Sequence, residues 1–180
     1  MEFKKIQLNG FKSFAEKTNF LIEDGLTGIV GPNGCGKSNI VESLRWVMGE
    51  TSAKSMRGSG MEDVIFSGTS NKASKNIAEV SIEVENKDKE GPIQYRELEQ
   101  IQVRRKIEKD KGSKFYINDK EVRARDAQMF FADLSTGAHS PSMISQGRIG
   151  ALVTAKPTDR RAILEEAAGI SGLHVRRHEA

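Results

Sequence analysis

The sequence is poor in the residues that build disulfide frameworks and membrane spans. It has one cysteine, Cys35, and four prolines among its 180 residues. A single cysteine excludes an internal disulfide and is consistent with a reducing compartment. No apolar run approaches the roughly 18 residues that a transmembrane helix needs, and the first residues alternate charged and apolar side chains, unlike a secretion signal. We therefore expect a cytoplasmic chain without a membrane partner.

Charge of one sign is also scarce, but it is unevenly distributed. The net charge is +3, with 37% hydrophobic and 29% charged residues, which suits one domain with its own core. Residues 104–125 nevertheless hold nine Lys or Arg against four Asp or Glu, a local excess of five. Composition alone favours a solvated hairpin kept soluble by its lysines. A surface for an anionic partner is the other interpretation.

The spacing of apolar residues predicts strands and then a helix in the first third of the chain. Residues 2–8 alternate as a half-buried strand does, residues 18–22 form a second strand, and residues 26–30 (LTGIV) form a short apolar strand. After Lys37 the spacing becomes one, three and four, which predicts a helix with Gly49 as its C-terminal cap. Its expected apolar face consists of Ile40, Val41, Leu44, Val47 and Met48.

Residues 76–122 predict an antiparallel layer of strands. Within 76–86, small and branched apolar residues alternate with Glu and Ser, so one face is expected to be buried and the other wet. Further strands are predicted over 97–107 and 113–119, with Asn118-Asp119 as a hairpin turn. The buried face of the first strand is expected to hold Ala78, Val80, Ile82 and Val84.

The last third of the chain is predicted to be helical. A short helix is expected over residues 123–133, and a second helix over 157–169 begins with a proline in its first turn and ends at Gly169. Beyond Gly172 the residues remain charged and compatible with a helix. We expect the chain to end inside a helix and to be part of something longer.

Residues 31–38, GPNGCGKS, match the phosphate-loop pattern G-x-x-x-x-G-K-[ST] at every position. Glycines let backbone N–H groups curl around an anion, and the following helix directs its positive dipole end at the same point. Lys37 can reach the β- and γ-phosphates, and the Ser38 hydroxyl can ligate Mg²⁺. A glycine-rich turn that binds nothing is the alternative, but the motif arises by chance in such a length on the order of 1% of the time. The predicted phosphate-binding residues are Gly31, Pro32, Asn33, Gly34, Cys35, Gly36, Lys37, Ser38 and Asn39.

Five segments occur in a fixed order along the chain: GFKSFAEKT, GIVGPNGCGKSNIVESLRWVMGE, KSMRGSGMEDVIFSGT, ISQGRI and RRAILEEAAGI. Together, and in this order, they resemble the N-terminal half of the ATPase head of SMC (structural maintenance of chromosomes) proteins, most closely the bacterial condensin type. The resemblance implies an α/β fold, the N-terminal lobe of a P-loop, ABC-type ATPase head over residues 1–172, with an antiparallel β-layer. Residues 173–180 would start a coiled-coil arm, and ATP and Mg²⁺ would be the cofactors.

The resemblance also implies roles for individual residues. Lys37 and Gln146 would be catalytic, and Gln146 in ISQGRI would be the Q-loop glutamine that touches Mg²⁺ and the attacking water. Ser38 would be the other metal ligand. Arg57 in SMRG would reach the phosphates of the nucleotide. Without the resemblance, Gln146 is a polar loop residue and Arg57 a solvated cation on a flexible loop.

Three further segments imitate family motifs, and we reject them. LSTGA (134–138) is similar to the signature L-S-G-G but precedes ISQGRI and lacks the glycine pair. MFFAD (129–133) could end in a metal-binding aspartate, but no Glu follows and the segment suits a helix. The pair Glu165-Glu166 fits a helix face. We therefore expect the chain to hold the nucleotide-binding half of the catalytic apparatus and to hydrolyse ATP negligibly alone.

By this resemblance, the chain belongs to a nucleoid-associated ATPase of chromosome condensation and partitioning that organises DNA through ATP-driven head engagement. The implied partners are DNA without sequence preference, a second copy bound through a hinge and the engaged heads, and a kleisin-type bridging subunit with its accessory protein. The candidate contacts to DNA phosphates are Lys54, Lys72, Lys75 and the basic strand Arg104–Lys106.

Three alternatives remain open. DNA-repair ATPases of the Rad50 or RecN-like type share GxNGxGKS but would not be expected to carry KSMRG and RRAILEEAAG together. A nucleotide-binding scaffold that dimerises without turnover is a second alternative, and a simple kinase is a weak third.

Overall fold

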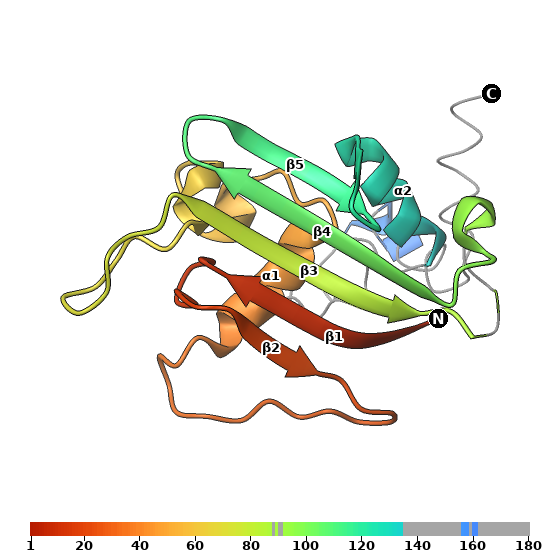
Figure 1. The fold of residues 1–180 in the computed structure, drawn as a ribbon, viewed down its shortest axis with the longest axis horizontal. Coiled ribbons are helices and arrows are strands. Elements are labelled where there is room, and N and C mark those ends of the chain that lie inside the picture. Colours follow the sequence, from red (N-terminus) through yellow and green to blue (C-terminus); the bar gives the residue numbers. More distant parts are fainter. Residues whose placement is uncertain (88, 90–91, 135–155, 159, 162–180) are drawn as a thin grey trace.

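The computed structural model describes residues 1–87, 89, 92–134, 156–158 and 160–161. In this part of the chain, one antiparallel sheet has the strand order β2-β1-β3-β4-β5-β6, and α1 lies behind it in the view of Figure 1. The strands are β1 (Glu2–Asn9), β2 (Thr18–Leu21), β3 (Ile77–Glu85), β4 (Gln100–Glu108), β5 (Gly112–Ile117) and β6 (Lys120–Val122). The helices are α1 (Lys37–Val47) and α2 (Ala124–Asp133), with short 3-10 helices η1 (Lys54–Met56), η2 (Met61–Val64) and η3 (Ile93–Tyr95).

The alternation predicted for β3 is confirmed on its buried face. The four predicted residues, from Ala78 to Val84, are at most 2% exposed and join the core formed with α1 and α2. The opposite face was predicted to be wet, but Glu79, Glu83 and Glu85 are half-buried and Ser81 is buried, at 4% exposed. Cross-strand ion pairs cover this face, because Glu83 accepts from Lys5 at 2.9 Å and Glu79 pairs with Arg104 at 3.3 Å.

The hairpin turn predicted at Asn118-Asp119 is also confirmed. It joins β5 to β6, and both residues have positive φ, 46° and 62°. A two-residue turn with this backbone matches the right-handed twist of the strands it connects, and Asn and Asp tolerate the left-handed region better than most residues.

Helix α1 ends as the sequence predicts, but its buried face differs. Gly49 has φ of 105° and donates to the Trp46 carbonyl at 3.1 Å, while Glu50 N donates to the Arg45 carbonyl at 3.1 Å. These two bonds form the glycine C-cap of a helix. Of the predicted face, Ile40, Val47 and Met48 are buried, while Val41 and Leu44 are only half-buried. The helix also buries Ser43, Trp46 and Glu42, which the predicted face did not include.

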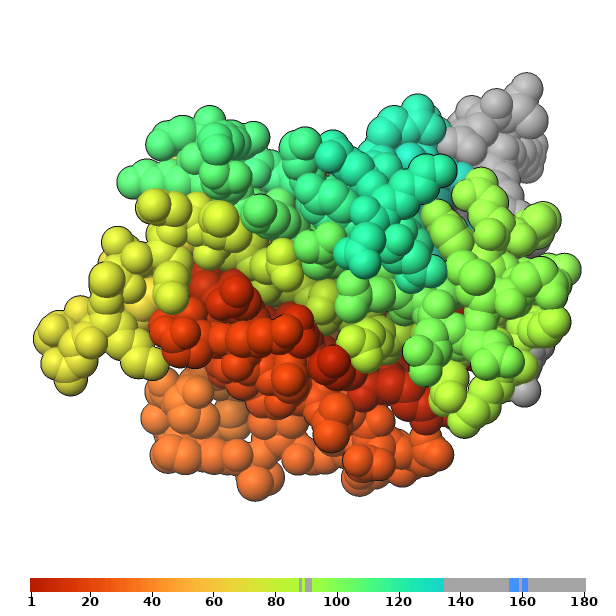
Figure 2. All heavy atoms as spheres, viewed as in Figure 1, coloured from red at the N-terminus to blue at the C-terminus, as the bar shows by residue number. Residues whose placement is uncertain are grey.

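The short strand predicted over residues 26–30 is absent, and this prediction was wrong. The segment has no regular secondary structure, and Leu26 and Val30 are 99% and 93% exposed. Figure 2 shows this part of the chain, in orange, along the surface of the molecule. A strand is stable only when its backbone pairs with a neighbour. The apolar segment lacks such a partner within the described residues.

The segment MFFAD is helical, which confirms the prediction that it suits a helix and does not form a metal-binding strand. It forms the second half of α2 and buries Phe130 and Phe131 in the core. Residues 157, 158, 160 and 161 are also helical, in agreement with the start predicted at Pro157. The rest of that helix, Gln146, most of LSTGA, the Glu165-Glu166 pair and residues 173–180 lie outside the described residues. None of the helices in the described ranges combines the length and apolarity that a membrane span requires.

Candidate functional site: the phosphate loop and its surroundings

The glycines of the phosphate loop are required by its backbone. Gly34 and Gly36 have φ of 83° and 93°, in the left-handed region that disfavours a side chain. A Cβ on Gly36 would also lie 2.6 Å from the Ser13 hydroxyl, and one on Gly31 would lie 2.9 Å from the Cys35 sulfur. The loop therefore folds tightly on itself directly before α1, with a backbone that favours glycine at positions 34 and 36.

The N-terminus of α1 is open to an anion, whereas that of α2 is not. At α1, the cap residue Gly36 makes no side-chain capping bond among the described residues, and the first turn holds no acid. At α2, the cap residue Arg123 likewise makes no side-chain capping bond, but the first turn holds Asp126, whose carboxylate accepts from the Arg123 amide at 3.1 Å and offsets the helix dipole. Free N–H groups and an uncompensated helix dipole attract negative charge. The geometry thus favours an anion at the loop before α1.

The Lys37 ammonium lies across this loop. It donates to the Gly31 and Pro32 carbonyls, each at 2.6 Å, and its nitrogen is 3.8 Å from the exposed Cys35 sulfur. The loop, the open helix end and one cation suit a polyphosphate. Within the described part of the chain, no group of three or more His, Cys, Asp or Glu could hold a metal ion. Ser38, exposed in the first turn of α1, is the predicted Mg²⁺ ligand that this loop itself contributes, with phosphate oxygens supplying others.

The structure places Arg57 beside the first turns of α1. Its Nη2 donates to the Asn39 side-chain oxygen at 3.1 Å, and its Nε forms an ion pair with Glu42. Asn39 in turn donates to the Ser13 hydroxyl at 2.9 Å. Arg57 and Asn39 are thus brought together near the loop, as their predicted role needs. The sequence interpretation missed Glu42, because the apolar spacing placed it on the exposed side of α1 and its partners Lys12 and Arg57 are distant in the sequence.

The basic strand proposed as a DNA contact must be corrected at Arg105. Arg105 is 3% exposed and points into the core, so it cannot reach a DNA phosphate. Its neighbour Arg104 faces the other side of the sheet, where it pairs with Glu79 and with Asp119 at 2.8 Å. Side chains alternate across a strand, so a basic run of three cannot present all its charges on one face. Lys54 and Lys72 are exposed, while Lys75 and Lys106 are half-buried.

Arg105 instead fixes the end of α1 to the sheet. Its Nη1 donates to the Trp46 and Glu50 carbonyls at 2.7 Å each, and its Nε donates to the Ser113 hydroxyl at 2.7 Å. The guanidinium also lies over the rings of Trp46 and Phe115, at 4.5 and 4.6 Å. Burial lowers the pKa of Arg105 to about 10, which leaves it protonated at neutral pH. A cation here adds a second donor to the Trp46 carbonyl, which already accepts from the Gly49 amide, and it lies favourably at the negative end of the helix dipole.

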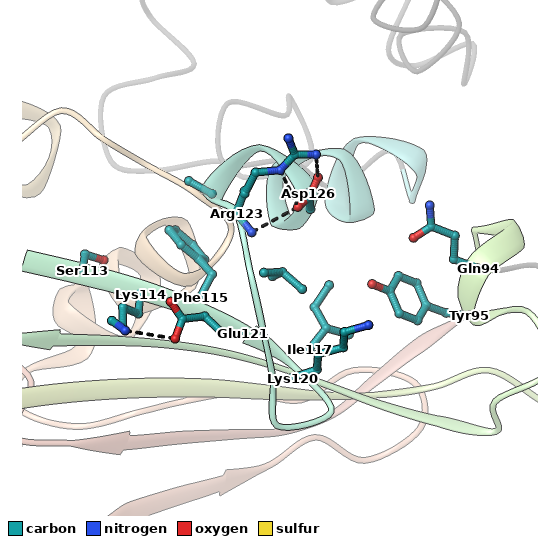
Figure 3. Close-up of a pocket in the computed structure, with 12 residues that line it drawn as sticks. Gln94, Tyr95, Ser113, Lys114, Phe115, Ile117, Lys120, Glu121, Arg123 and Asp126 are labelled. Carbon is teal, nitrogen blue, oxygen red and sulfur yellow. Dashed lines mark hydrogen bonds and ion pairs between the residues drawn. The ribbon is translucent and has the colours of Figure 1, made fainter.

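A separate cavity of about 920 Å³ lies away from the phosphate loop, between the β5–β6 hairpin, the start of α2 and η3 (Figure 3). Its charged lining groups are largely paired with each other. Lys114 pairs with Glu121 at 3.0 Å, and Arg123 pairs with Asp126 at 3.2 Å. Cavity volume alone does not make a site, and the chemistry for phosphate lies elsewhere, at α1.

The comparisons with known proteins agree with this geometry. A family model described as the RecF/RecN/SMC N terminal domain matches residues 2–148. This chain belongs to that family. It is 56% identical to a chromosome partition protein Smc of Cereibacter sphaeroides and 53% identical to one of Rhodopseudomonas palustris, each over 180 residues. These matches cover 100% of the chain but 16% of each relative, so the chain spans about a sixth of their length.

Solved SMC heads share the fold. A chain from work on the ATP-driven dimerization and DNA-stimulated activation of SMC ATPases has a TM-score of 0.81 at 30% identity, covering 93% of this chain and 99% of that one. The Smc head of Pyrococcus furiosus, with an extended coiled coil and bound to the C-terminal domain of ScpA, has a TM-score of 0.86 at 30% identity, covering 98% and 44%. The fold is therefore the α/β N-terminal lobe of an ABC-type SMC head, which confirms the resemblance to SMC proteins.

Proposed function

We propose that this SMC chain is the ATP-binding half of an ATPase that partitions and condenses chromosomes. The observation that supports this most is the open N-terminus of α1 behind a glycine loop that Lys37 crosses. Residues 31–39 would hold the phosphates and Ser38 the Mg²⁺, with Arg57 and Gln146 completing the site. Bound Mg²⁺ would neutralise phosphate charge, while the loop amides and Lys37 orient the triphosphate.

Within the described part of the chain, the site lacks a carboxylate placed to orient the attacking water. Asp133 of MFFAD ends a helix, behind the buried Phe130 and Phe131, and so is not at the end of a strand beside the loop. The exposed apolar residues Leu26 and Val30 lead directly into the loop and suit a strand supplied by another segment. We infer that a second segment completes the head, and that a signature motif from a second head completes the site. A γ-phosphate contacted by both heads would favour their engagement until it is cleaved.

Adding the C-terminal half of the same protein in trans tests this proposal. The chain alone should show negligible ATP hydrolysis, because none of its described residues places a carboxylate to orient water. With the second half present, the rate of phosphate release should rise by roughly tenfold or more. Circular dichroism of both halves serves as the folding control. Well-folded halves that associate yet release no phosphate would contradict a head divided in this way, and steady turnover would exclude the non-hydrolysing scaffold.

DNA would be the polymer on which the engaged heads act. Lys54 and Lys72 are the exposed residues that remain as candidates for contacts with DNA phosphates. Such contacts would be independent of DNA sequence and sensitive to salt. Reversing both charges to Glu should lower the stimulation of ATPase by DNA severalfold in the full-length protein, without changing the basal rate. Unchanged stimulation across a salt series would remove these lysines from the interface.

The other proposed partners come from the relatives. The solved Pyrococcus furiosus head was bound to the C-terminal domain of ScpA, which supports a kleisin-type bridging subunit for this protein too, together with an accessory protein. We also propose a homodimer, joined through a hinge and through ATP-engaged heads, because the resemblance to SMC proteins implies it. The curated relatives are chromosome partition proteins, so this function is favoured over a repair ATPase of the Rad50 or RecN-like type.

A further inference from the structure

A buried carboxylate on α1 forms ion pairs with two cations beside the phosphate loop. Glu42 lies on the second turn of α1, and its side chain is 11% exposed. One oxygen, Oε2, pairs with the Lys12 ammonium, and the other, Oε1, pairs with Nε of Arg57. Nothing in the phosphate-loop motif requires an acid at this position. Because buried charges are costly unless paired, this arrangement must be held by its partners.

The two cations both sit on strained backbone. Lys12 and Arg57 have φ of 47° and 55°, in the left-handed region. The other described non-glycine residues with positive φ are Lys89, Asp110, Asn118 and Asp119, and Asp110, Asn118 and Asp119 belong to turns between strands. Lys12 also donates to the Met56 carbonyl, one residue before Arg57. Such backbone persists only where surrounding contacts fix it, and here both strained residues converge on Glu42.

The contact with Glu42 leaves part of the Arg57 guanidinium free. A guanidinium has five N–H donors in a planar fork. Nε is paired with Glu42 and Nη2 donates one bond to Asn39, whereas Nη1 has no partner among the described residues. The Arg57 side chain is 58% exposed. Asn39 binds Ser13, whose hydroxyl packs against Gly36 at the end of the loop. The free edge of the fork therefore stays beside the loop.

We propose that Glu42 is a positioning residue of the nucleotide site. It holds Arg57 through Nε, so that the outer edge of the guanidinium faces a triphosphate bound in the loop. Glu42, Lys12 and Arg57 together carry one net positive charge, so the cluster still attracts an anion. This inference rests on the proposed function, because Arg57 can serve a phosphate only if the loop binds nucleotide.

A double-mutant cycle in the full-length protein tests this role. Glu42→Gln keeps the shape of the side chain and removes its charge, and it should raise the Kd for Mg-ATP by about tenfold, because Arg57 loses a charge-assisted bond that fixes its direction. Arg57→Ala should raise the Kd by a similar factor. The double variant should bind no more weakly than Arg57→Ala alone, because Glu42 acts through Arg57. Equilibrium binding by calorimetry provides all four Kd values.

The controls separate positioning from a structural role. Glu83→Gln removes an ion pair of similar kind on the opposite face of the sheet and should leave the Kd unchanged. Glu42→Asp keeps the charge and should give an intermediate Kd, and it replaces Glu42→Gln in the cycle if that variant unfolds. An unchanged Kd in the single variants, or an equal loss from the Glu42 change with and without Arg57, would overturn the inference. Failure of the wild-type protein to bind Mg-ATP would instead overturn the proposed function.

Discussion

Replacing Lys37 by alanine should abolish Mg-ATP binding at the concentrations that saturate the wild-type chain. The Lys37 ammonium is held across the loop by the carbonyls of Gly31 and Pro32, where it would meet the most charged part of the nucleotide. A charge-assisted contact to phosphate contributes more than a neutral hydrogen bond. Its loss should raise the Kd on the order of a hundredfold, which equilibrium titration with a fluorescent ATP analogue can measure.

A matched lysine shows whether the effect is local. Lys106 lies on β4, on the face of the sheet that carries the cross-strand ion pairs, so Lys106→Ala should leave the Kd unchanged. Both variants should retain the wild-type circular dichroism spectrum, because the Lys37 side chain contacts only its own loop among the described residues. If a folded Lys37→Ala variant kept its affinity for Mg-ATP, the phosphate loop would not be the nucleotide site.

Replacing Arg105 by methionine should have the largest effect on stability. The substitution keeps much of the apolar volume but removes three hydrogen bonds, two of them to the carbonyls of Trp46 and Glu50 at the end of α1. The Glu50 carbonyl would lose its bond from Arg105, and the Trp46 carbonyl would keep only the Gly49 amide. A buried acceptor that is left without a donor costs about 1–3 kcal/mol. We expect the free energy of unfolding, measured by urea denaturation, to fall by about 3–5 kcal/mol.

The adjacent arginine is the natural control for this substitution. Arg104 faces the other side of β4, over the ring of Tyr116, and its side chain is 24% exposed in ion pairs with Glu79 and Asp119. Partly exposed pairs of this kind contribute about 0–1 kcal/mol. Arg104→Met should therefore cost about 1 kcal/mol or less. Equal losses of stability for the two variants would show that Arg105 is not the anchor of α1.

The features that sequence predicted well are those set by neighbouring residues. The buried face of β3 follows from alternation, the turn at Asn118-Asp119 from the tolerance of these residues for positive φ, and the end of α1 from Gly49. The glycine loop belongs to the same class, because its motif specifies its own backbone. Arg57 lies beside α1, in contact with Asn39 and Glu42, and its contact with the phosphates, which the resemblance to SMC proteins implied, stays a prediction.

The features that sequence missed depend on contacts between distant parts of the chain. Arg105 in a basic run looks exposed until β4 is placed over Trp46, and Glu42 becomes meaningful only when Lys12 and Arg57 reach it. The strand predicted over residues 26–30 failed for a related reason. Apolar spacing indicates that a segment tends to be buried, but it does not say which segment supplies the partner.

A calorimetric titration of the folded wild-type chain with ATP, in the presence and absence of Mg²⁺, measures directly whether the loop before α1 binds nucleotide. We expect one Mg-ATP to bind per chain, because the loop amides and the Lys37 ammonium, ahead of an uncapped helix, form one polyphosphate site in the described part of the chain. Chelation of the metal should weaken this uptake. If a chain with intact secondary structure binds no nucleotide in either condition, the loop before α1 is not a nucleotide site.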